Sequence, residues 1–538
     1  MLTKKITALL FSILLCHSNI HAQDSLLLRD YRYIQQSSPW LTQNQSAALT
    51  LFNTQNIAEA EIALSHASGK LTGFSGSPSL TTLQATIESY YRISPRTVVY
   101  GAISYHNQSG DDMTGSVFMQ ERLPFDIVED SPTNQGRKHR DTYRLTGACG
   151  YDIYNGYAIG FKADYTSANY AKYKDLRHKN KLMDLALTAG VFAPFTPWLN
   201  VGLDYTYHRR TESLQFSIYG KSDKVYKSLI DYGAMMGIVE QFGNEGYTNK
   251  SNEMPLFEDG HGIGLQLEVC PLSALSIFGS MGYSHATGYY GCKSPYTITY
   301  TDHDRDIFTS QVRLAYNLET TKAILDVHYQ SEKLQNRINT YRGLTNNYGA
   351  THYEYYDAAD ASEKGWRNLD FDYTMFLGVR QQLPTWTITA GYHFQQRDVT
   401  AYFYPYYRQQ QLRTHDVQAS LTRNLMLSKG IWSLTLKGGY KKGTGAPYTD
   451  GTFVTPSNKQ PQPATVEAFL WRDYQYETAP QYNLGLQVKY SFLFPGTKLH
   501  THLRAAFDYQ RAKISDETPS GFHNPQRTTI TIAAGHTF

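Results

Sequence analysis

The chain has 538 residues, of which 14% are aromatic (44 Tyr, 24 Phe and 6 Trp) and 40 are Gly. Charged residues make up only 18%, and the 50 basic side chains nearly balance the 47 acidic ones. With a mean hydropathy of -0.47, these values exclude a helical membrane protein and a strongly basic nucleic-acid surface, so we expect no nucleic-acid partner. Such a composition is typical of a membrane β-barrel, whose strands alternate apolar and polar residues.

The N-terminus predicts a secretory signal peptide over residues 1–22. Lys4 and Lys5 precede an apolar run of about ten residues, too short for a membrane span. Ala22 supplies the small residue expected before the cleavage site. We therefore expect export across the inner membrane of a Gram-negative bacterium.

Residues 23–56 are expected to form a short periplasmic or lumenal segment. Tyr31, Tyr33 and Trp40 give it apolar anchors for packing against a wall. The segment is much shorter than the plug of a TonB-dependent transporter. It is instead a candidate hatch, similar to the N-terminal hatch of fatty-acid channels.

The rest of the chain, residues 57–538, predicts one barrel. Alternation of apolar and polar residues recurs along it, for example over residues 198–208 and 482–492. These segments of about 10 to 13 residues exceed soluble strands of about five or six and suit tilted membrane strands. A soluble β-sandwich also alternates, but aromatic residues crowd the ends of the apolar face, as an interfacial girdle requires.

Short turns alternate with long connections along this barrel region. Short turns, as at Tyr154-Asn155-Gly156, predict the periplasmic side. Long polar connections predict extracellular loops, and they lie near 109–140, 210–258, 287–306, 335–367 and 445–479. The pattern predicts an all-β, transmembrane, antiparallel up-and-down β-barrel of about 18 strands, with 16 as the alternative.

The last predicted strand covers about 528–538 and ends in Phe538. An amphipathic final strand with an aromatic end looks like the signal read by the outer-membrane assembly machinery, which we expect as a partner beside the membrane lipid. The signal peptide, the segment Ser38-Pro39-Trp40-Leu41, the Tyr-rich hairpins and Phe538 together resemble an outer-membrane β-barrel family of Bacteroides-type bacteria. That family has no assigned function, so the resemblance implies a fold and a location only.

Polar residues on the inward face are candidates for setting selectivity. Basic residues on consecutive strands would favour anions, with Glu59 and Glu61 offsetting part of the charge. A wetted, charge-balanced interior is the simpler interpretation. The lumen candidates are Lys437, Lys441, Lys489, His500, His502, Arg504 and Asp508, with Lys162, Asp164, Asp204 and His208 from earlier strands.

Metal and disulfide signals are weak. His500 and His502 share one face, but the sequence fixes no third ligand. The aspartates between Asp302 and Asp306 lack the glycine and the terminal Glu of a calcium loop. We therefore expect no metal and no cofactor. Cys149 and Cys270 are interpreted as small strand residues, and pairing of Cys270 with Cys292 stays open.

Aromatic clusters in the predicted loops are candidates for ligand binding, because Tyr offers a large contact area at low entropic cost. Girdle tyrosines at the lipid boundary are the alternative. The candidates are Tyr353, Tyr355, Tyr356, Tyr404, Tyr406 and Tyr407.

Motifs of the common hydrolases and nucleotide enzymes are absent, so we do not expect an enzyme. The sequence favours diffusion or energy-independent transport of a small solute across the outer membrane. The alternative is a surface accessory barrel with a closed lumen, whose long loops bind a ligand or a partner such as a receptor or lipoprotein.

Overall fold

The structure, a computed structural model, describes residues 29–129, 133–220, 223–244, 246–250, 253–427, 430–494, 499–514, 522 and 525–538. The predicted signal peptide over 1–22 and the predicted turn at 495–497 lie outside these residues. Within the described ranges, no helix is long and apolar enough to cross a membrane.

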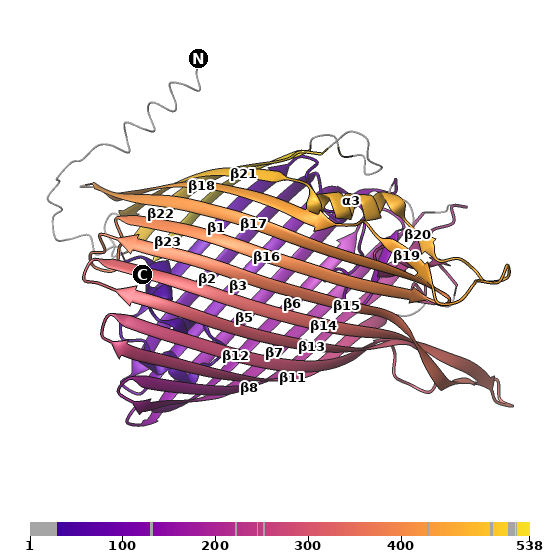
Figure 1. Cartoon of the computed structure of the whole chain (residues 1–538), viewed down its shortest axis with the longest axis horizontal. Coiled ribbons are helices and arrows are strands. Elements are labelled where there is room, and N and C mark those ends of the chain that lie inside the picture. The colour runs from indigo at the N-terminus through magenta and orange to yellow at the C-terminus, as the bar shows by residue number, and fades with distance from the viewer. Residues whose placement is uncertain are drawn as a thin grey trace, which may run out of the picture.

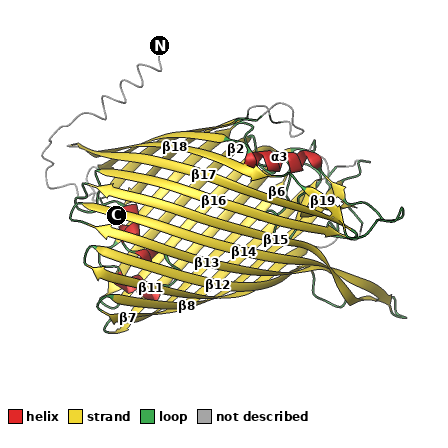
Figure 2. Cartoon of the chain, in the orientation of Figure 1, coloured by secondary structure: helices red, strands yellow, loops and turns green. Residues whose placement is uncertain are grey.

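Eighteen antiparallel strands form a closed barrel, in which each wall strand pairs with the next and the last pairs with the first (Figures 1 and 2). This confirms the predicted transmembrane up-and-down barrel and the higher of the two strand counts. The wall strands are β1 (Ile57–Ser68), β2 (Ser79–Ser94), β3 (Thr97–Met113), β5 (Gly136–Tyr154), β6 (Tyr157–Lys172), β7 (Arg177–Thr196), β8 (Leu199–Ser217), β11 (Met254–Leu272), β12 (Leu275–Gly291), β13 (Thr299–Asn317), β14 (Thr321–Thr345), β15 (Thr351–Leu377), β16 (Trp386–Phe403), β17 (Tyr406–Leu427), β18 (Gly430–Gly445), β21 (Gln481–Leu493), β22 (His500–Ala512) and β23 (Gln526–Thr537).

The alternation seen in the sequence sets which face of the wall meets lipid. Leu484 and Leu486 on β21 are exposed on the outer face, whereas Asn483 and Gly485, which alternate with them, line the lumen. On β23, Ile530 and Ile532 form the same outward stripe. The outer face is therefore an apolar belt suited to the membrane core.

One rim carries short turns, together with the N-terminal helices and the C-terminus (Figure 1). At the turn between β5 and β6, Asn155 and Gly156 both have positive φ values, 50° and 86°. Asn and Gly tolerate this left-handed backbone, which a two-residue hairpin of matching twist requires. We assign this as the periplasmic rim.

The opposite, extracellular rim is uneven because β14 and β15 extend beyond it as a hairpin (Figure 1). Only residues 346–350 form its turn, so the polar loop predicted over 335–367 is corrected to strand. Polar and aromatic side chains predominate on both faces of this hairpin, so the apolar alternation that reveals membrane strands is missing there. Tyr353, Tyr355 and Tyr356 consequently lie on β15 rather than in a loop.

Three extracellular connections fold inward and form what we call the cap. Its four-stranded sheet has the order β20-β10-β9-β4. Phe125, Ile230 and Tyr232 lie in its buried core, which extends to inward residues of the wall. The cap comprises β4 (Asp126–Glu129), β9 (Lys227–Gly233), β10 (Met236–Gln241), β20 (Ala464–Thr465) and α3 (Glu467–Thr478), and the short β19 (Thr449–Thr452) pairs with β17 outside it.

Three short helices occupy the periplasmic end of the lumen: α2 (Tyr31–Ser37), η1 (Pro39–Thr42) and η2 (Ala47–Leu51). The Asp30 side chain caps α2 by accepting a hydrogen bond from the Tyr33 backbone amide. We refer to them as the N-terminal helices.

Candidate functional site: a polar chamber in the lumen

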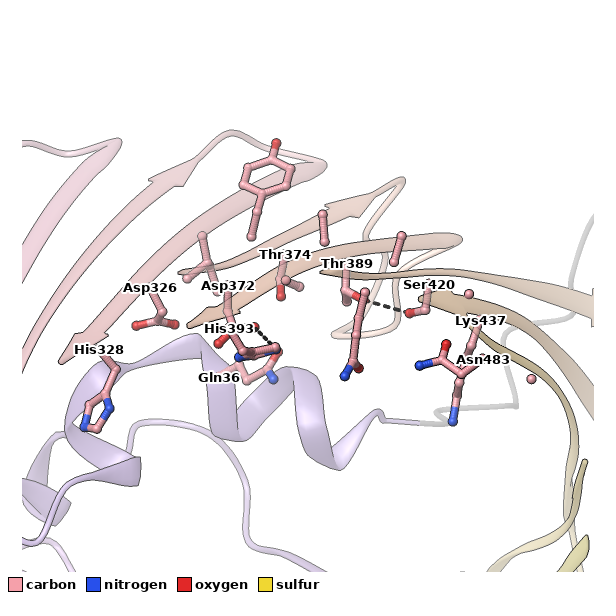
Figure 3. Close-up of a pocket in the computed structure, with 18 of the residues that line it drawn as sticks. Gln36, Asp326, His328, Asp372, Thr374, Thr389, His393, Ser420, Lys437 and Asn483 are labelled. Carbon is pink, nitrogen blue, oxygen red and sulfur yellow. Dashed lines mark hydrogen bonds and ion pairs between the residues drawn. The ribbon is translucent and has the colours of Figure 1, made fainter. Parts of the chain in front are cut away.

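A cavity of about 910 Å³ lies in the lumen along β13–β18 and β21–β23, and Figure 3 shows part of its lining. Three residues along β15 locate the cavity. Phe376 contacts Tyr33 of the N-terminal helices, Asp372 lines the cavity, and Lys364 donates a hydrogen bond to the Arg122 carbonyl in the cap. The cavity therefore lies between the N-terminal helices and the cap. We call it the polar chamber.

The chamber wall is built from polar groups held by their neighbours. Arg313 donates two hydrogen bonds of 2.8 Å, one to each carboxylate oxygen of Asp326. His393 Nδ1 lies 2.8 Å from Asp370 Oδ1. The inward members of the lining are Gln36, Gln311, Arg313, Asp326, His328, Asp372, Thr374, Thr389, His393, Gln418, Ser420, Lys437, Asn483, Asp508, Gln510 and Thr529.

The charges of this lining come in both signs, and they alternate with amides and hydroxyls. Thr389 and Ser420, for example, share a hydrogen bond of 2.7 Å across β16 and β17 (Figure 3). Amides and hydroxyls both donate and accept hydrogen bonds. The chamber can therefore solvate a polar solute without selecting strongly for one charge.

Two of the candidate selectivity residues, Lys437 and Asp508, line the chamber. The others are divided among different contacts. Lys441 Nζ lies 2.9 Å from Glu477 of α3, so it anchors the cap. Lys489 lies opposite Arg504 in the β21–β22 ladder. The predicted basic surface is thus interrupted by carboxylates.

The two candidate histidines have separate surroundings. His502 Nε2 lies 3.0 Å from Glu61 Oε2, and Arg504 Nε donates to the same oxygen at 3.2 Å. His500 belongs to no such pair among the described residues. The described part of the chain contains no cluster of three metal-ligating side chains.

The aspartates of residues 302–306 point outward and have separate partners. Asp304 pairs with Arg337, and Asp306 lies 2.9 Å from His285. Carboxylates engaged one by one with basic groups do not form the joint oxygen cage that calcium needs.

The earlier lumen candidates lie on the other side of the barrel, near a second cavity of about 410 Å³ that includes Asp204 and His208 in its lining. Gln266 donates to Asp204 at 2.6 Å, and Lys162 lies 3.1 Å from Asp164. Lys162 also donates to Asn44 beside η2. Lys162 therefore connects the wall to the N-terminal segment, whereas Asp204 bonds within the wall.

Trp40 is the main contact of the N-terminal helices, and it is only 1% exposed. Its indole nitrogen donates to Glu268 at 2.6 Å, and its ring packs edge-on against Phe192 and Phe278. On β14, two strands from Phe278 of β12, Lys322 donates to the Ser37 carbonyl at 2.7 Å. The hydroxyl of Tyr90 on β2 also donates to the Leu41 carbonyl at 3.1 Å, so the N-terminal helices span the lumen from β2 to Phe376 on β15. Sequence reasoning named Trp40 as an anchor but had no signal for Glu268.

Asp473 on α3 holds the cap to the wall. It pairs with Arg122 and, at 2.6 Å, with Arg397 of β16. Burial would raise the pKa of Asp473, but the two arginines lower it below its ordinary value. Burial raises the pKa of Asp126 to about 8, so the cap also contains a carboxyl group that favours its protonated form.

The tyrosine candidates fall into two groups. Tyr404 is 69% exposed, and its ring stacks with Phe453, which Tyr407 also contacts at 5.0 Å between ring centroids. On the projecting hairpin, Tyr356 is exposed, whereas the Tyr355 hydroxyl accepts from the Thr299 amide at 2.7 Å.

Tyr353 packs against the cap core, and Tyr406 pairs with Thr452 of β19. Only part of the predicted aromatic surface is thus free to contact a ligand. The three described cysteines, Cys149, Cys270 and Cys292, are not disulfide-bonded.

Comparison with known proteins gives a family. The model of a family of unknown function, DUF6850, matches residues 46–538. No curated protein matches the chain. Solved structures with a similar fold include the ferric preacinetobactin receptor BauA of Acinetobacter baumannii (8% identity, 90% of this chain and 80% of that chain, TM-score 0.42) and the outer membrane transporter YddB of Escherichia coli (7% identity, 90% and 81%, TM-score 0.41). At these values the likeness carries no argument about function.

Proposed function

We propose that this chain, which belongs to the DUF6850 family of unknown function, lets a small polar solute cross the outer membrane through its lumen without an energising partner. The polar chamber carries this proposal. A barrel that served only as an anchor would have no need of a cavity of about 910 Å³ lined by hydrogen-bonding groups. The N-terminal helices act as a periplasmic gate, because they cross the lumen without being part of the barrel wall, to which side chains such as Trp40 attach them.

The test is ion conductance of the purified protein in a planar bilayer, which supplies no energy source. We compare the full mature chain with a variant lacking residues 23–45, and with Trp40→Ala. Removal of the Trp40 ring deletes its contacts with Phe192 and Phe278 and leaves the Glu268 carboxylate without its indole donor. We expect rare openings in the parent chain and steady conductance after truncation, with an intermediate open fraction for Trp40→Ala.

Trp198→Ala is the matched control, because Trp198 lies exposed at the same rim, in the turn between β7 and β8. It should behave like the parent chain. Silence of all variants would contradict transport. Equal steady conductance in all of them would support an open pore and contradict the gating role of the N-terminal helices.

The second candidate function is ligand or partner binding at the extracellular rim. The exposed stack of Tyr404 on Phe453 favours it, as does Tyr348 at the tip of the projecting hairpin, which is 97% exposed. Silence in every conductance experiment would make this function the leading one.

A further inference from the structure

Four basic side chains lie exposed on the outer face within the run of strands from β15 to β22, near the extracellular rim. Arg367 is on β15, Arg413 on β17, Lys442 on β18 and Arg511 on β22. Their register places them on the outward face, because Arg413 shares its side of β17 with the exposed Val417 and Leu421. We call these four residues the outer basic stripe.

The stripe lies at the boundary of the apolar belt. Arg413 is separated by ten residues from Arg423, which lies on the same face of β17 with its guanidinium 4.7 Å from the Trp386 ring. Lys442 has the same separation from the outward Trp432 on β18. A tilted membrane strand uses about 9 to 11 residues to cross the hydrocarbon, so Arg413 and Lys442 reach the headgroup level of the outer leaflet.

The charges in the stripe are close together. Gln396 of β16 pairs with Arg367 on one side and with Arg413 on the other. Two strand spacings of about 4.8 Å separate the two arginines, which is within one Debye length of about 8 to 10 Å. The positive electrostatic potentials of Arg367 and Arg413 therefore add together at this part of the surface.

One nearby carboxylate, Asp398, offsets only part of the positive charge of these four side chains. Asp398 lies two residues from Gln396 on the same face of β16. Its carboxylate accepts hydrogen bonds from Gln396 at 2.8 Å and from Gln411 at 2.7 Å. Within the described ranges of the chain, none of the four basic groups forms an ion pair. Elsewhere around the same rim, outward basic residues do have carboxylate partners, as Arg337 does in Asp304.

From this arrangement we propose that the outer basic stripe binds the phosphate groups of lipid headgroups in the extracellular leaflet. Clustered Lys and Arg at a membrane boundary attract anionic headgroups, and the guanidinium fork matches a phosphate. The apolar belt directly below the stripe receives the acyl chains of the same lipid. A free phosphate ion would have the charge but not this second contact.

The experiment measures thermal unfolding of the full mature chain in detergent micelles doped with lipid A, with dephosphorylated lipid A, or in the presence of inorganic phosphate. We expect stabilisation by phosphorylated lipid A only. Arg367→Gln/Arg413→Gln should raise the half-saturating lipid fraction about thirtyfold, since each basic side chain near an anionic surface contributes roughly fivefold.

Arg96→Gln/Arg380→Gln removes the same charge from turns at the periplasmic rim and should keep the response of the parent chain. Arg367→Lys/Arg413→Lys tests charge separately from folding, and it should retain most of the binding. Equal stabilisation by the two lipids, or an unchanged response in the Gln double variant, would overturn the proposal. An equal effect of inorganic phosphate would assign the stripe to a free ion instead of a lipid.

Discussion

Single residues on β21 show how strictly the wall separates its two faces. Leu486 points to lipid and Gln487 points to the lumen, although the two residues are consecutive in the chain. An arginine on the lipid face must leave water for hydrocarbon, whereas one on the inner face stays hydrated.

We therefore expect Leu486→Arg to destabilise the barrel by about 2–4 kcal/mol, and Gln487→Arg to have little effect. Urea unfolding in detergent or lipid measures both values. Equal loss in the two variants would show that the register of β21 is wrong.

Asp473 is the residue on which the cap depends most. Asp473→Asn leaves Arg122 and Arg397 buried with a neutral partner, and removing one member of a buried ion pair costs about 3–5 kcal/mol. The cap should loosen, and added protease should cleave within residues 223–244 and 453–466 of intact cells. Glu477→Gln, which removes the partner of the less buried Lys441, serves as the control and should cost only about 1 kcal/mol.

At the scale of elements, the cap responds to pH. Burial raises the pKa of Glu240 on β10 from 4.5 to about 7, although the Tyr247 and Thr248 amides lower it. Between these values the folded cap keeps a proton that the unfolded segment releases, so the stability of the cap falls as the pH rises through this window.

Hydrogen exchange of the cap amides at pH 5 and pH 8 checks this expectation. Protection should be greater at pH 5, and Glu240→Gln should reduce the difference by roughly 2 kcal/mol, whereas Asp126, whose pKa is raised to about 8, keeps its own contribution. Glu253→Gln is the control, because the pKa of the exposed Glu253 is lowered by Ser213 and this residue is already charged at both pH values. Greater protection at pH 8 in the parent chain would contradict the assignment.

The sequence predicts the wall elements well and the cap poorly, for a physical reason. A membrane strand must alternate apolar and polar residues, so β21 and β23 are visible in the chain itself. The sheet of β4, β9, β10 and β20 forms through contacts between loops that are far apart in the sequence. Gly237 of β10, for example, pairs with Ala464 of β20. No local sequence pattern encodes such pairing. The sequence left open whether the loop over residues 210–258 folds into the lumen or stays outside it.

The same limit applies to the site. The inward face of β18 identified Lys437 as a chamber residue, but Arg313, Asp326 and His393 were missed. The strands that carry these residues have many polar residues on both faces near the rim. The alternation of apolar and polar residues therefore does not distinguish lumen-facing from solvent-facing side chains there. The path of the N-terminal helices, which fixes where the chamber ends, depends on the Trp40–Glu268 contact across 228 positions.

For the whole molecule, Phe538 joins the two ends of the wall. Its amide and carbonyl exchange hydrogen bonds with Ala58 at 2.9 and 2.7 Å. We propose that the assembly machinery reads the Phe538 side chain, so we expect Phe538→Ala to lower the amount of assembled barrel in cells severalfold while leaving refolding into detergent nearly unchanged. Heat-modified gel mobility measures the folded fraction, and the outward Phe507→Ala is the control. Equal losses in both settings would show a purely structural role.

The ladder between β1 and β23 differs from every other ladder of the wall, because Ser68 meets Thr528 across nearly the whole chain. All the other wall strands meet a near neighbour in sequence, so an open, curled sheet grows hairpin by hairpin at low contact order. The ring closes only when the first and the last strand meet, a pairing of high sequence separation that follows the formation of the hairpins between them. Until then two unpaired strand edges are exposed, and the nascent sheet is vulnerable to pairing with another copy of itself.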